Sequence, residues 1–189
     1  MRIILASNSP RRKELLAQTG IKFEVIASEF EESMVELPAS KLAEYFAYMK
    51  AKDVARSIQG DALIIGSDTI VYCDEIMGKP GSGEEAFDML TKLSGKQHLV
   101  ISGISIINTA TGESLTEHES TEVKIKNLSS AEITAYINTG EPADKAGAYA
   151  IQGLGSLFVE GIRGDYFNVV GLPLFRLRNM LEHFGVKLI

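Results

Sequence analysis

The chain has 189 residues, of which 45% are hydrophobic and 23% charged, which is typical of one globular domain, or of one domain with a small lobe. A net charge of −6 argues against a nucleic-acid polymer as partner, because such interfaces need a broad basic surface. No stretch approaches the roughly 20 apolar residues of a membrane span. The single cysteine, Cys73, excludes an intramolecular disulfide and a cysteine metal cluster. We therefore expect a cytoplasmic protein without membrane contact.

The first predicted element is a buried strand over residues 2–6, followed by a polar turn and a helix that begins at Pro10. Ser9 suits the N-cap, so the free NH groups of the first turn are available to an anion, above all to phosphate. Cations are normally placed at the other end of a helix, yet Arg11, Arg12 and Lys13 follow at once. This run is either a solvated face or one side of a polyphosphate site, in which Arg11 and Arg12 are the better ligands.

Strands and helices alternate along the rest of the chain, which indicates an α/β fold. The predicted strands are 23–27, 62–67, a hairpin of 69–72 with 76–77, the long strands 98–107 and 114–126, and Gly-rich strand segments from 147 to 171. The predicted helices are 10–19, 40–58, 84–93, 130–138 and 173–184. We expect a mixed, elongated, twisted sheet with helices on its faces, as a single domain over 1–189 with a smaller lobe at about 84–140.

Asp68 is the first candidate for catalysis. It is predicted to follow the buried strand 62–67, and open α/β sheets bind ligands beyond the carboxyl ends of their strands. Gly66 permits close backbone approach, and the hydroxyls of Ser67 and Thr69 can bind phosphate oxygens or orient water. The alternative is that Asp68 only forms a turn.

Two lysines are further candidates. Lys79 lies between Gly78 and Pro80, so a stiff loop displays it, although exposed loop lysines are common. Lys50 falls within the apolar arc of helix 40–58, whereas Lys52 points elsewhere. Lys50 either extends along its apolar neighbours to solvent or is a partly buried ammonium facing an anionic ligand or a carboxylate. The three histidines have no metal-ligand spacing, and we assign them no role.

Several motifs, taken together, resemble the Maf family nearly end to end, in the family's order and spacing. They are ASNSPRRKELL (6–16), GSDT (66–69), GKP (78–80), LSG (93–95), EPADKAGAY (141–149) and GLP (171–173). That family consists of nucleoside triphosphate pyrophosphatases with a fold related to inosine triphosphate pyrophosphatase. The resemblance implies such a fold here, with two lobes around a central cleft, and a homodimer as one option.

The resemblance also implies a reaction, which is hydrolysis of a nucleoside triphosphate to the monophosphate and pyrophosphate with Mg²⁺ or Mn²⁺. Asp68 matches the family's proposed proton acceptor. The positions that line its phosphate and metal site match Ser7, Arg11, Arg12, Glu32, Lys50 and Lys79. Asp68 and Glu32 are the expected metal ligands. Because coordination lowers the proton affinity of a carboxylate, the resemblance leaves open whether Asp68 is base, ligand or both.

Substrate choice follows from three positions that separate the family's branches. Arg11, Thr69 and Gln152 look like the dTTP/UTP branch, and the Gln152 amide offers both a donor and an acceptor to a uracil-type base. Ala150 departs from the family, since many members have glycine there, which affects the details of base selection. Modified pyrimidine nucleotides are alternative substrates. The rival functions are a nucleotide-binding regulator of septum formation without turnover, and a phosphatase that removes only the γ-phosphate.

Overall fold

The computed structural model describes residues 1–33 and 35–189. The chain forms two compact units. Unit 1 consists of Met1–Asp68, Ser102–Glu119 and Gly171–Ile189, and unit 2 of Thr69–Ile101 and Ser120–Val170. Residues 84–101 and 120–140 therefore fall in unit 2 and residues 102–119 in unit 1. The smaller lobe expected at 84–140 and the cleft between lobes stay predictions.

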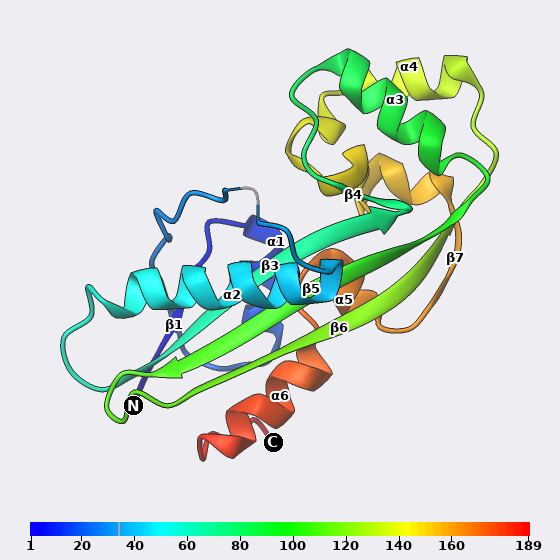
Figure 1. Ribbon diagram of the computed structural model, residues 1–189. Helices are drawn as coiled ribbons and strands as arrows, with labels where there is room; N and C mark the ends of the chain where they lie inside the picture. The colour runs from blue at the N-terminus through cyan, green and yellow to red at the C-terminus, as the bar shows by residue number, and fades with distance from the viewer. Residues whose placement is uncertain (34) are drawn as a thin grey trace. The chain divides into compact units, whose positions relative to one another are not determined.

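A seven-stranded sheet carries the fold (Figure 1). Its strands are β1 (Arg2–Leu5), β2 (Glu24–Val25), β3 (Ala62–Cys73), β4 (Glu75–Met77), β5 (Gln97–Asn108), β6 (Ser114–Ile125) and β7 (Val159–Arg163). The strand order is β2-β1-β3-β5-β6-β7, with β4 paired to β3. Strand β1 runs parallel to β2 and β3, whereas the pairs β3–β4 and β6–β7 are antiparallel. This mixed sheet confirms the predicted α/β class.

The predicted helices are confirmed with small shifts at their ends, whereas helix α5 and the 3₁₀ helices were not predicted. The α-helices are α1 (Pro10–Gln18), α2 (Ala39–Ala55), α3 (Gly83–Leu93), α4 (Ser130–Ile137), α5 (Tyr166–Val170) and α6 (Leu174–His183). The 3₁₀ helices are η1 (Glu141–Asp144), η2 (Ala146–Ala148) and η3 (Gly153–Phe158). Among the described residues, none of the helices is both long and apolar enough to cross a membrane.

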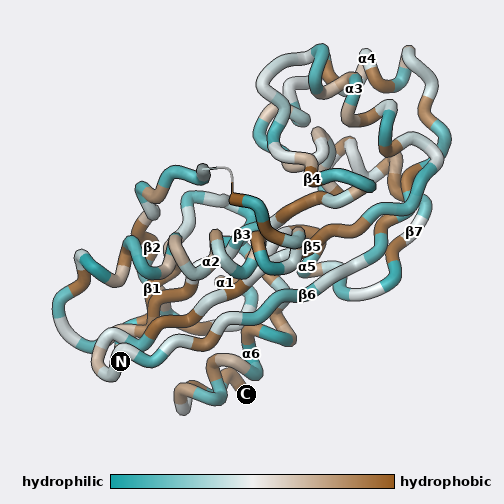
Figure 2. Tube along the Cα trace, viewed as in Figure 1, coloured by the Kyte–Doolittle hydropathy of each residue, from teal (hydrophilic) through white to brown (hydrophobic). Residues whose placement is uncertain are grey.

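In unit 1, helix α2 lies against strands β3 and β5 at van der Waals distance (Figure 1). Two glycines make this possible, because a Cβ on Gly66 would lie 2.2 Å from the Ala47 carbonyl oxygen, and a Cβ on Gly103 would lie 2.1 Å from that of Ala43. Apolar side chains of α2, β1 and β3 fill the interface, and Figure 2 shows the apolar course of these strands. Gly66 therefore serves the packing of a helix.

Unit 2 has a core of its own, built from the second half of β3, from α3 and α4, and from the 3₁₀ segments. Ser82 caps α3, and Ser129 with Glu132 forms a complete capping box at the start of α4. Gly147, with φ of +67°, packs against Val71, since a Cβ there would lie 2.9 Å from the valine side chain.

Two sequence predictions about strands were wrong. Strand β3 continues without a break from Ala62 to Cys73, so it does not end at residue 67 and Asp68 lies inside it. The run is almost wholly buried, it is rich in β-branched residues, and it contains no proline that would break the pairing. The predicted hairpin of 69–72 with 76–77 is confirmed, with its turn at Asp74, where φ is +61°. Residues 147–171 were predicted as strand segments, but only β7 is a strand. The rest forms two 3₁₀ helices and one short α-helix, because left-handed residues such as Gly153 bend the chain.

Candidate active site

Two carboxylates meet at one ammonium in unit 1. The Nζ of Lys50, on α2, donates to Oδ1 of Asp68 on β3 at 2.6 Å. It also donates to Oε1 of Glu32, in the loop that precedes α2, at 2.6 Å. The Lys50 side chain is 16% exposed, that of Asp68 10% and that of Glu32 47%. The apolar arc of helix 40–58 therefore holds a partly buried ammonium that faces carboxylates, one of the two alternatives that the sequence left open.

The alternation of side chains along a strand explains to which face of β3 the Asp68 side chain points. Residues two apart lie on one face of a strand, so Asp68 shares the face of Gly66, which is packed against α2. Ser67 lies on the opposite face and is fully buried, and its hydroxyl donates to the Gly171 carbonyl at 3.1 Å. The proposed contact of Ser67 with phosphate is therefore wrong, because the hydroxyl is committed to the backbone.

The electrostatic environment of Asp68 combines burial with two cations. Burial raises the pKa of Asp68, while the charges of Lys50 and Arg12 lower it and that of Glu32 raises it, with a net increase. A carboxyl group with a raised pKa is a better proton acceptor than an ordinary aspartate. Asp68 thus has the surroundings of a functional carboxylate.

Glu32 reaches this site because α2 fixes the loop that carries it. Oδ2 of Asp53 accepts hydrogen bonds from the Ser28 hydroxyl and the Glu29 backbone NH, both at 2.8 Å. The Ser28 hydroxyl in turn accepts from the Phe30 NH at 3.0 Å. Sequence reasoning missed Asp53, although its spacing of three residues from Lys50 places both side chains on neighbouring helix positions.

The start of α1 has the local geometry expected of it. Ser9 caps the helix by accepting from the Arg12 backbone NH, and Ser7, which is buried, accepts from the Ser9 NH at 3.2 Å. The Arg12 side chain folds back so that its Nε donates to the Gly171 carbonyl at 2.9 Å. Burial lowers the pKa of Arg12, and the charge of Asp68 raises it.

Gly171 was quoted only as part of a motif, but its carbonyl accepts from both Arg12 and Ser67. The sequence feature that could have indicated this role is the GLP triplet before the last helix.

Arg11 is half-buried, and within residues 1–33 and 35–189 no carboxylate forms an ion pair with it. Arg11 therefore has a charge available for a ligand.

The remaining candidates belong to unit 2. Lys79 is exposed, and its loop is tied down on both sides by a Gly147 NH to Gly78 carbonyl bond of 3.0 Å and a Gly81 NH to Glu85 bond of 2.7 Å. Thr69 and Gln152 are half-buried. Unit 1 thus gathers Asp68, Lys50 and Glu32, while the places of Lys79, Thr69 and Gln152 in the same site stay predictions.

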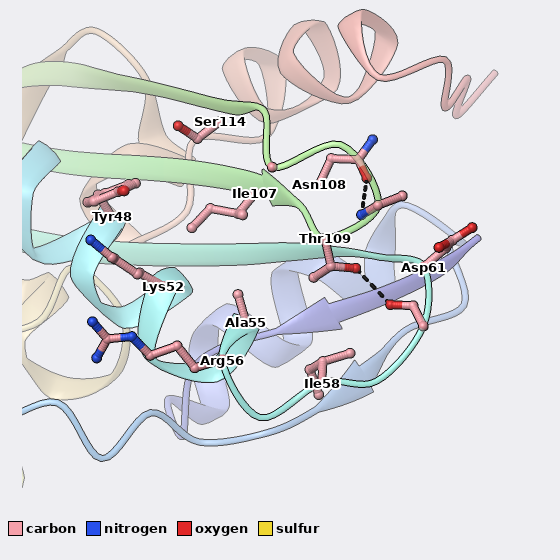
Figure 3. A pocket seen from close by; sticks show the side chains of 13 residues that line it. Tyr48, Lys52, Ala55, Arg56, Ile58, Asp61, Ile107, Asn108, Thr109 and Ser114 are labelled. Atoms are coloured by element: carbon pink, nitrogen blue, oxygen red, sulfur yellow. Dashed lines mark hydrogen bonds between the residues drawn. The ribbon is translucent and has the colours of Figure 1, made fainter.

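Lys52 points away from this cluster, as the helix projection predicted. Its Nζ lies 5.3 Å from the centroid of the Tyr48 ring. Both residues line a separate open cavity of about 550 Å³ in unit 1, together with Arg56 and the turn at 108–110 (Figure 3). None of the candidate site residues lines this cavity.

The sequence model of the Maf-like protein family matches residues 2–184, which is nearly the whole chain. The chain belongs to the Maf-like protein family. It is 51% identical over 189 residues to a dTTP/UTP pyrophosphatase of Alkaliphilus oremlandii, with 99% of the chain and 98% of that protein covered. It is 52% identical over 191 residues to a dTTP/UTP pyrophosphatase of Ruminiclostridium cellulolyticum, with the same coverage.

A relative from Methanococcoides burtonii, also described as a dTTP/UTP pyrophosphatase, is 48% identical over 190 residues, with 99% of the chain and 97% of the relative covered. Among solved structures, a dITP/XTP pyrophosphatase from Mycobacterium abscessus is 15% identical and has a TM-score of 0.47, with 98% and 95% of the two chains covered. The family assignment rests on the sequence relatives.

The donor chemistry of the carboxylate pair fits a divalent cation. Glu32 and Asp68 converge on the single positive charge of Lys50, and both offer the hard oxygen ligands that Mg²⁺ and Mn²⁺ prefer. No cluster of three or more His, Cys, Asp or Glu side chains with metal-site geometry occurs among the residues that the structure describes. Mg²⁺ bound by one or two carboxylates usually completes its shell with phosphate oxygens and water, so two protein ligands suffice.

Proposed function

We propose that this Maf-like protein hydrolyses dTTP and UTP to the nucleoside monophosphate and pyrophosphate. The observation that carries the proposal is the sequence identity of 51% and 52% between this chain and two relatives described as dTTP/UTP pyrophosphatases, over nearly the full length of both chains. The buried Asp68 with its bound ammonium supports turnover, because a binding site alone does not need a carboxylate beside the phosphates.

The reaction that we propose is attack of a water oxygen on the α-phosphorus. The bond from that phosphorus to the bridging oxygen breaks, pyrophosphate leaves with the electron pair, and the water gives up its protons. Asp68 accepts one proton, directly or through a second water, and the raised pKa of its carboxyl group favours that transfer.

The cations have the task of stabilising charge on the departing pyrophosphate. Lys50 holds Asp68 and Glu32 in place and brings an ammonium to the reacting phosphates. Arg12 contributes a guanidinium held by Gly171, and Arg11 contributes a charge without a carboxylate partner among the described residues. Ser7 and the NH groups at the start of α1 bind phosphate oxygens, and Lys79 adds a charge from unit 2.

A bound divalent cation, Mg²⁺ or Mn²⁺, would neutralise part of the triphosphate charge and would lower the pKa of the water that it binds. Glu32 and Asp68 are the residues that would hold it. Lys50, whose ammonium donates to both carboxylates, would keep them close together and contribute its own positive charge beside them. Glu32, which is half-exposed, is free to share the role of base with Asp68.

Gln152 selects the base in this proposal. Its amide presents a donor and an acceptor, which match the O4 and N3–H of a uracil-type base. Thr69 and Arg11 complete the set that separates the family's branches. Modified pyrimidine triphosphates carry the same edge and are further substrates, in keeping with a house-cleaning role. A homodimer and a cytoplasmic location stay predictions.

Product analysis distinguishes this function from its rivals. A panel of natural and modified nucleoside triphosphates is incubated with Mg²⁺ or Mn²⁺, and pyrophosphate and orthophosphate are scored separately. We expect monophosphate and pyrophosphate from dTTP and UTP, and a loss of at least about 100-fold in rate for Asp68→Asn. Asp61→Asn is the matched control, because Asp61 is exposed and directly precedes the same strand.

Orthophosphate as the first product would favour removal of the γ-phosphate. Nucleotide binding without any turnover would favour the regulator of septum formation. Full activity of Asp68→Asn would contradict the mechanism while leaving the substrate assignment in place.

A further inference from the structure

Glu141 is bound to the segment that carries Gln152, and no role has been given to it so far. We propose that Glu141 is a positioning residue for base selection, which fixes the turn 150–155 and thereby the support from which the Gln152 amide reads the base. The inference rests on the proposed function, and it lies wholly within unit 2.

The Glu141 carboxylate binds the turn through both of its oxygens. Oε2 accepts from the Leu154 NH at 3.0 Å, and Oε1 accepts from the Gly155 NH at 3.0 Å. These NH groups belong to the first turn of η3, where they have no partner within the helix. The carboxylate therefore caps the N-terminus of η3, although it belongs to a residue more than ten positions earlier in the chain.

Tyr136 extends this arrangement. Its hydroxyl donates to Oε1 of Glu141 at 2.8 Å, and the Ala150 backbone hydrogen-bonds to the same hydroxyl. The pair thus holds the turn at both of its ends, at Ala150 and at residues 154–155. Burial raises the pKa of Tyr136, and the hydrogen bond to Glu141 raises it further, so the hydroxyl stays a donor.

The packing around the carboxylate leaves little room for another arrangement. A Cβ on Gly153, where φ is +71°, would lie 2.7 Å from Oε2 of Glu141. A Cβ on Gly155 would lie 2.4 Å from the Ala150 carbonyl oxygen and 2.6 Å from the Tyr136 hydroxyl. Both glycines are therefore needed for the turn to close around Glu141 and Tyr136.

The ionisation of Glu141 fits this role. Partial burial raises its pKa, but the NH groups of Gly155 and Leu154 and the Tyr136 hydroxyl lower it, with a net decrease. The group is thus an anion at neutral pH, which makes each of its hydrogen bonds charge-assisted and stronger than a neutral one.

Gln152 immediately precedes this fixed segment. It has extended backbone angles, with φ of −98° and ψ of 161°, and its side chain does not cap η3. A glutamine amide that turns by half a rotation presents its donor and acceptor in exchanged places, which matches cytosine. Discrimination of uracil-type bases from cytosine therefore needs a backbone that holds the amide in one position and direction.

The experiment measures kcat and KM of Glu141→Gln for dTTP and dCTP. The amide keeps the volume of the carboxylate, but it loses the charge and turns one acceptor into a donor that faces a backbone NH or the Tyr136 hydroxyl. We expect KM for dTTP to rise about tenfold, kcat to change less than about twofold, and the preference for dTTP over dCTP to fall about tenfold. Tyr136→Phe removes the bonds of the hydroxyl to Glu141 and to Ala150 but keeps the carboxylate with its bonds to the Leu154 and Gly155 NH groups, so we expect it to change the same quantities less.

Glu132→Gln is the matched control. Glu132 is also a capping carboxylate of unit 2, where its Oε2 accepts from the Ser129 NH at 2.9 Å, but it does not touch the turn 150–155. Its loss weakens the first turn of α4, whereas Tyr136 lies in the last turn of that helix, so we expect KM and base preference to stay within about twofold of the original. A general weakening of unit 2 would instead affect both variants alike.

The double variant Glu141→Gln/Gln152→Ala tests whether Glu141 acts through Gln152. We expect the effect of Glu141→Gln on base preference to disappear in the Gln152→Ala background, because residues that act as a unit are not additive. An unchanged KM and base preference in Glu141→Gln, or full additivity in the double variant, would overturn the inference. The absence of dTTP and UTP hydrolysis in the unmodified protein would overturn the proposed function instead.

If Glu141→Gln does not fold, Tyr136→Phe supplies the same comparison, since it keeps the buried ring. An unaltered base preference in a folded Tyr136→Phe variant with lowered stability would then contradict the inference.

Discussion

Lys50 is the residue on which the candidate site of unit 1 depends. It is the hydrogen-bond donor that Asp68 and Glu32 share, and it lies opposite a buried strand residue. Asp68 has little access to water, so an ion left alone there would be costly. The lysine therefore stabilises the ionised aspartate, and in the proposed reaction it brings positive charge to the phosphates at the same time.

Two lysines on the same helix test this assignment. We expect Lys50→Met to lower kcat/KM for dTTP by at least about 100-fold, because it removes the ammonium that stabilises developing charge and holds Asp68. Lys52→Met keeps the same helix propensity and charge change, but Lys52 lies over Tyr48 at the separate cavity, so its kcat/KM is expected to stay within about twofold. Steady-state kinetics with circular dichroism as a check of folding compares them, and equal losses would contradict the assignment.

At the level of elements, the close packing of α2 on β3 and β5 sets the geometry of the site. Gly66 and Gly103 let the helix backbone approach both strands, and the same helix carries Lys50 toward Asp68 and Asp53 toward the loop of Glu32. One helix therefore positions two of the three charged groups. A shift of α2 away from β3 by a fraction of an ångström would lengthen the hydrogen bond between Lys50 and Asp68.

Gly66→Ala tests this packing. Its Cβ would lie 2.2 Å from the Ala47 carbonyl oxygen, which is backbone and cannot turn away. We expect a loss of about 2–3 kcal/mol in the free energy of unfolding from overpacking, and a fall in kcat because α2 moves away from Asp68. Urea denaturation and dTTP turnover measure the two effects.

Gly161→Ala is the matched control for this variant, since a Cβ there meets nothing within 4 Å. It is expected to leave both quantities nearly unchanged. If Gly66→Ala kept its stability and activity, the close approach of α2 would not be needed for the site.

For the molecule as a whole, two compact units share three strands, and each unit has its own core. Unit 1 holds the carboxylates and the lysine, while unit 2 holds Gln152, Glu141 and Lys79. The carboxylates and Lys50, which we propose for the chemistry, and Gln152, which we propose for base selection, therefore belong to different packing units. The stability of each unit at a given pH depends on the titratable groups buried in that unit.

His98 makes the stability of unit 2 sensitive to acid. It is buried, its Nε2 lies 2.7 Å from the Tyr149 hydroxyl, and its Nδ1 has no hydrogen-bond partner among the described residues. Burial lowers the pKa of His98 to about 4. Because the unfolded chain binds the proton more tightly, the neutral histidine favours folding above pH 6.5, and this contribution is lost as the pH falls toward 4.

We expect the free energy of unfolding to fall by about 2 kcal/mol from this residue alone between pH 7.5 and pH 5. Urea denaturation followed by circular dichroism at both values, for the original chain and for His98→Gln, isolates the contribution. The variant is expected to be less stable at pH 7.5, since Tyr149 loses an ideal partner, but to change less with pH. An equal pH dependence in both proteins would show that the pKa of His98 is the same in the folded and the unfolded chain, and would contradict this prediction.

Local chemistry was enough to predict many elements. The cap Ser9 with Pro10 fixed the start of α1, and the alternation of 98–107 and 114–126 predicted β5 and β6, because periodicity and capping act within a few residues. The apolar arc of α2 singled out Lys50 over Lys52. Motif spacing singled out the family, and the relatives confirm it.

What the sequence determined by itself was the class of fold, the family and a short set of candidate residues for the chemistry, because these depend on local pattern and on motif order. Only the tertiary structure decided that Lys50 joins Asp68 to Glu32, that Ser67 is committed to Gly171, and that Glu141 holds the turn after Gln152. Each of these contacts joins side chains or backbone groups from different elements. Their partners are chosen by packing over long sequence separations, which no local pattern contains.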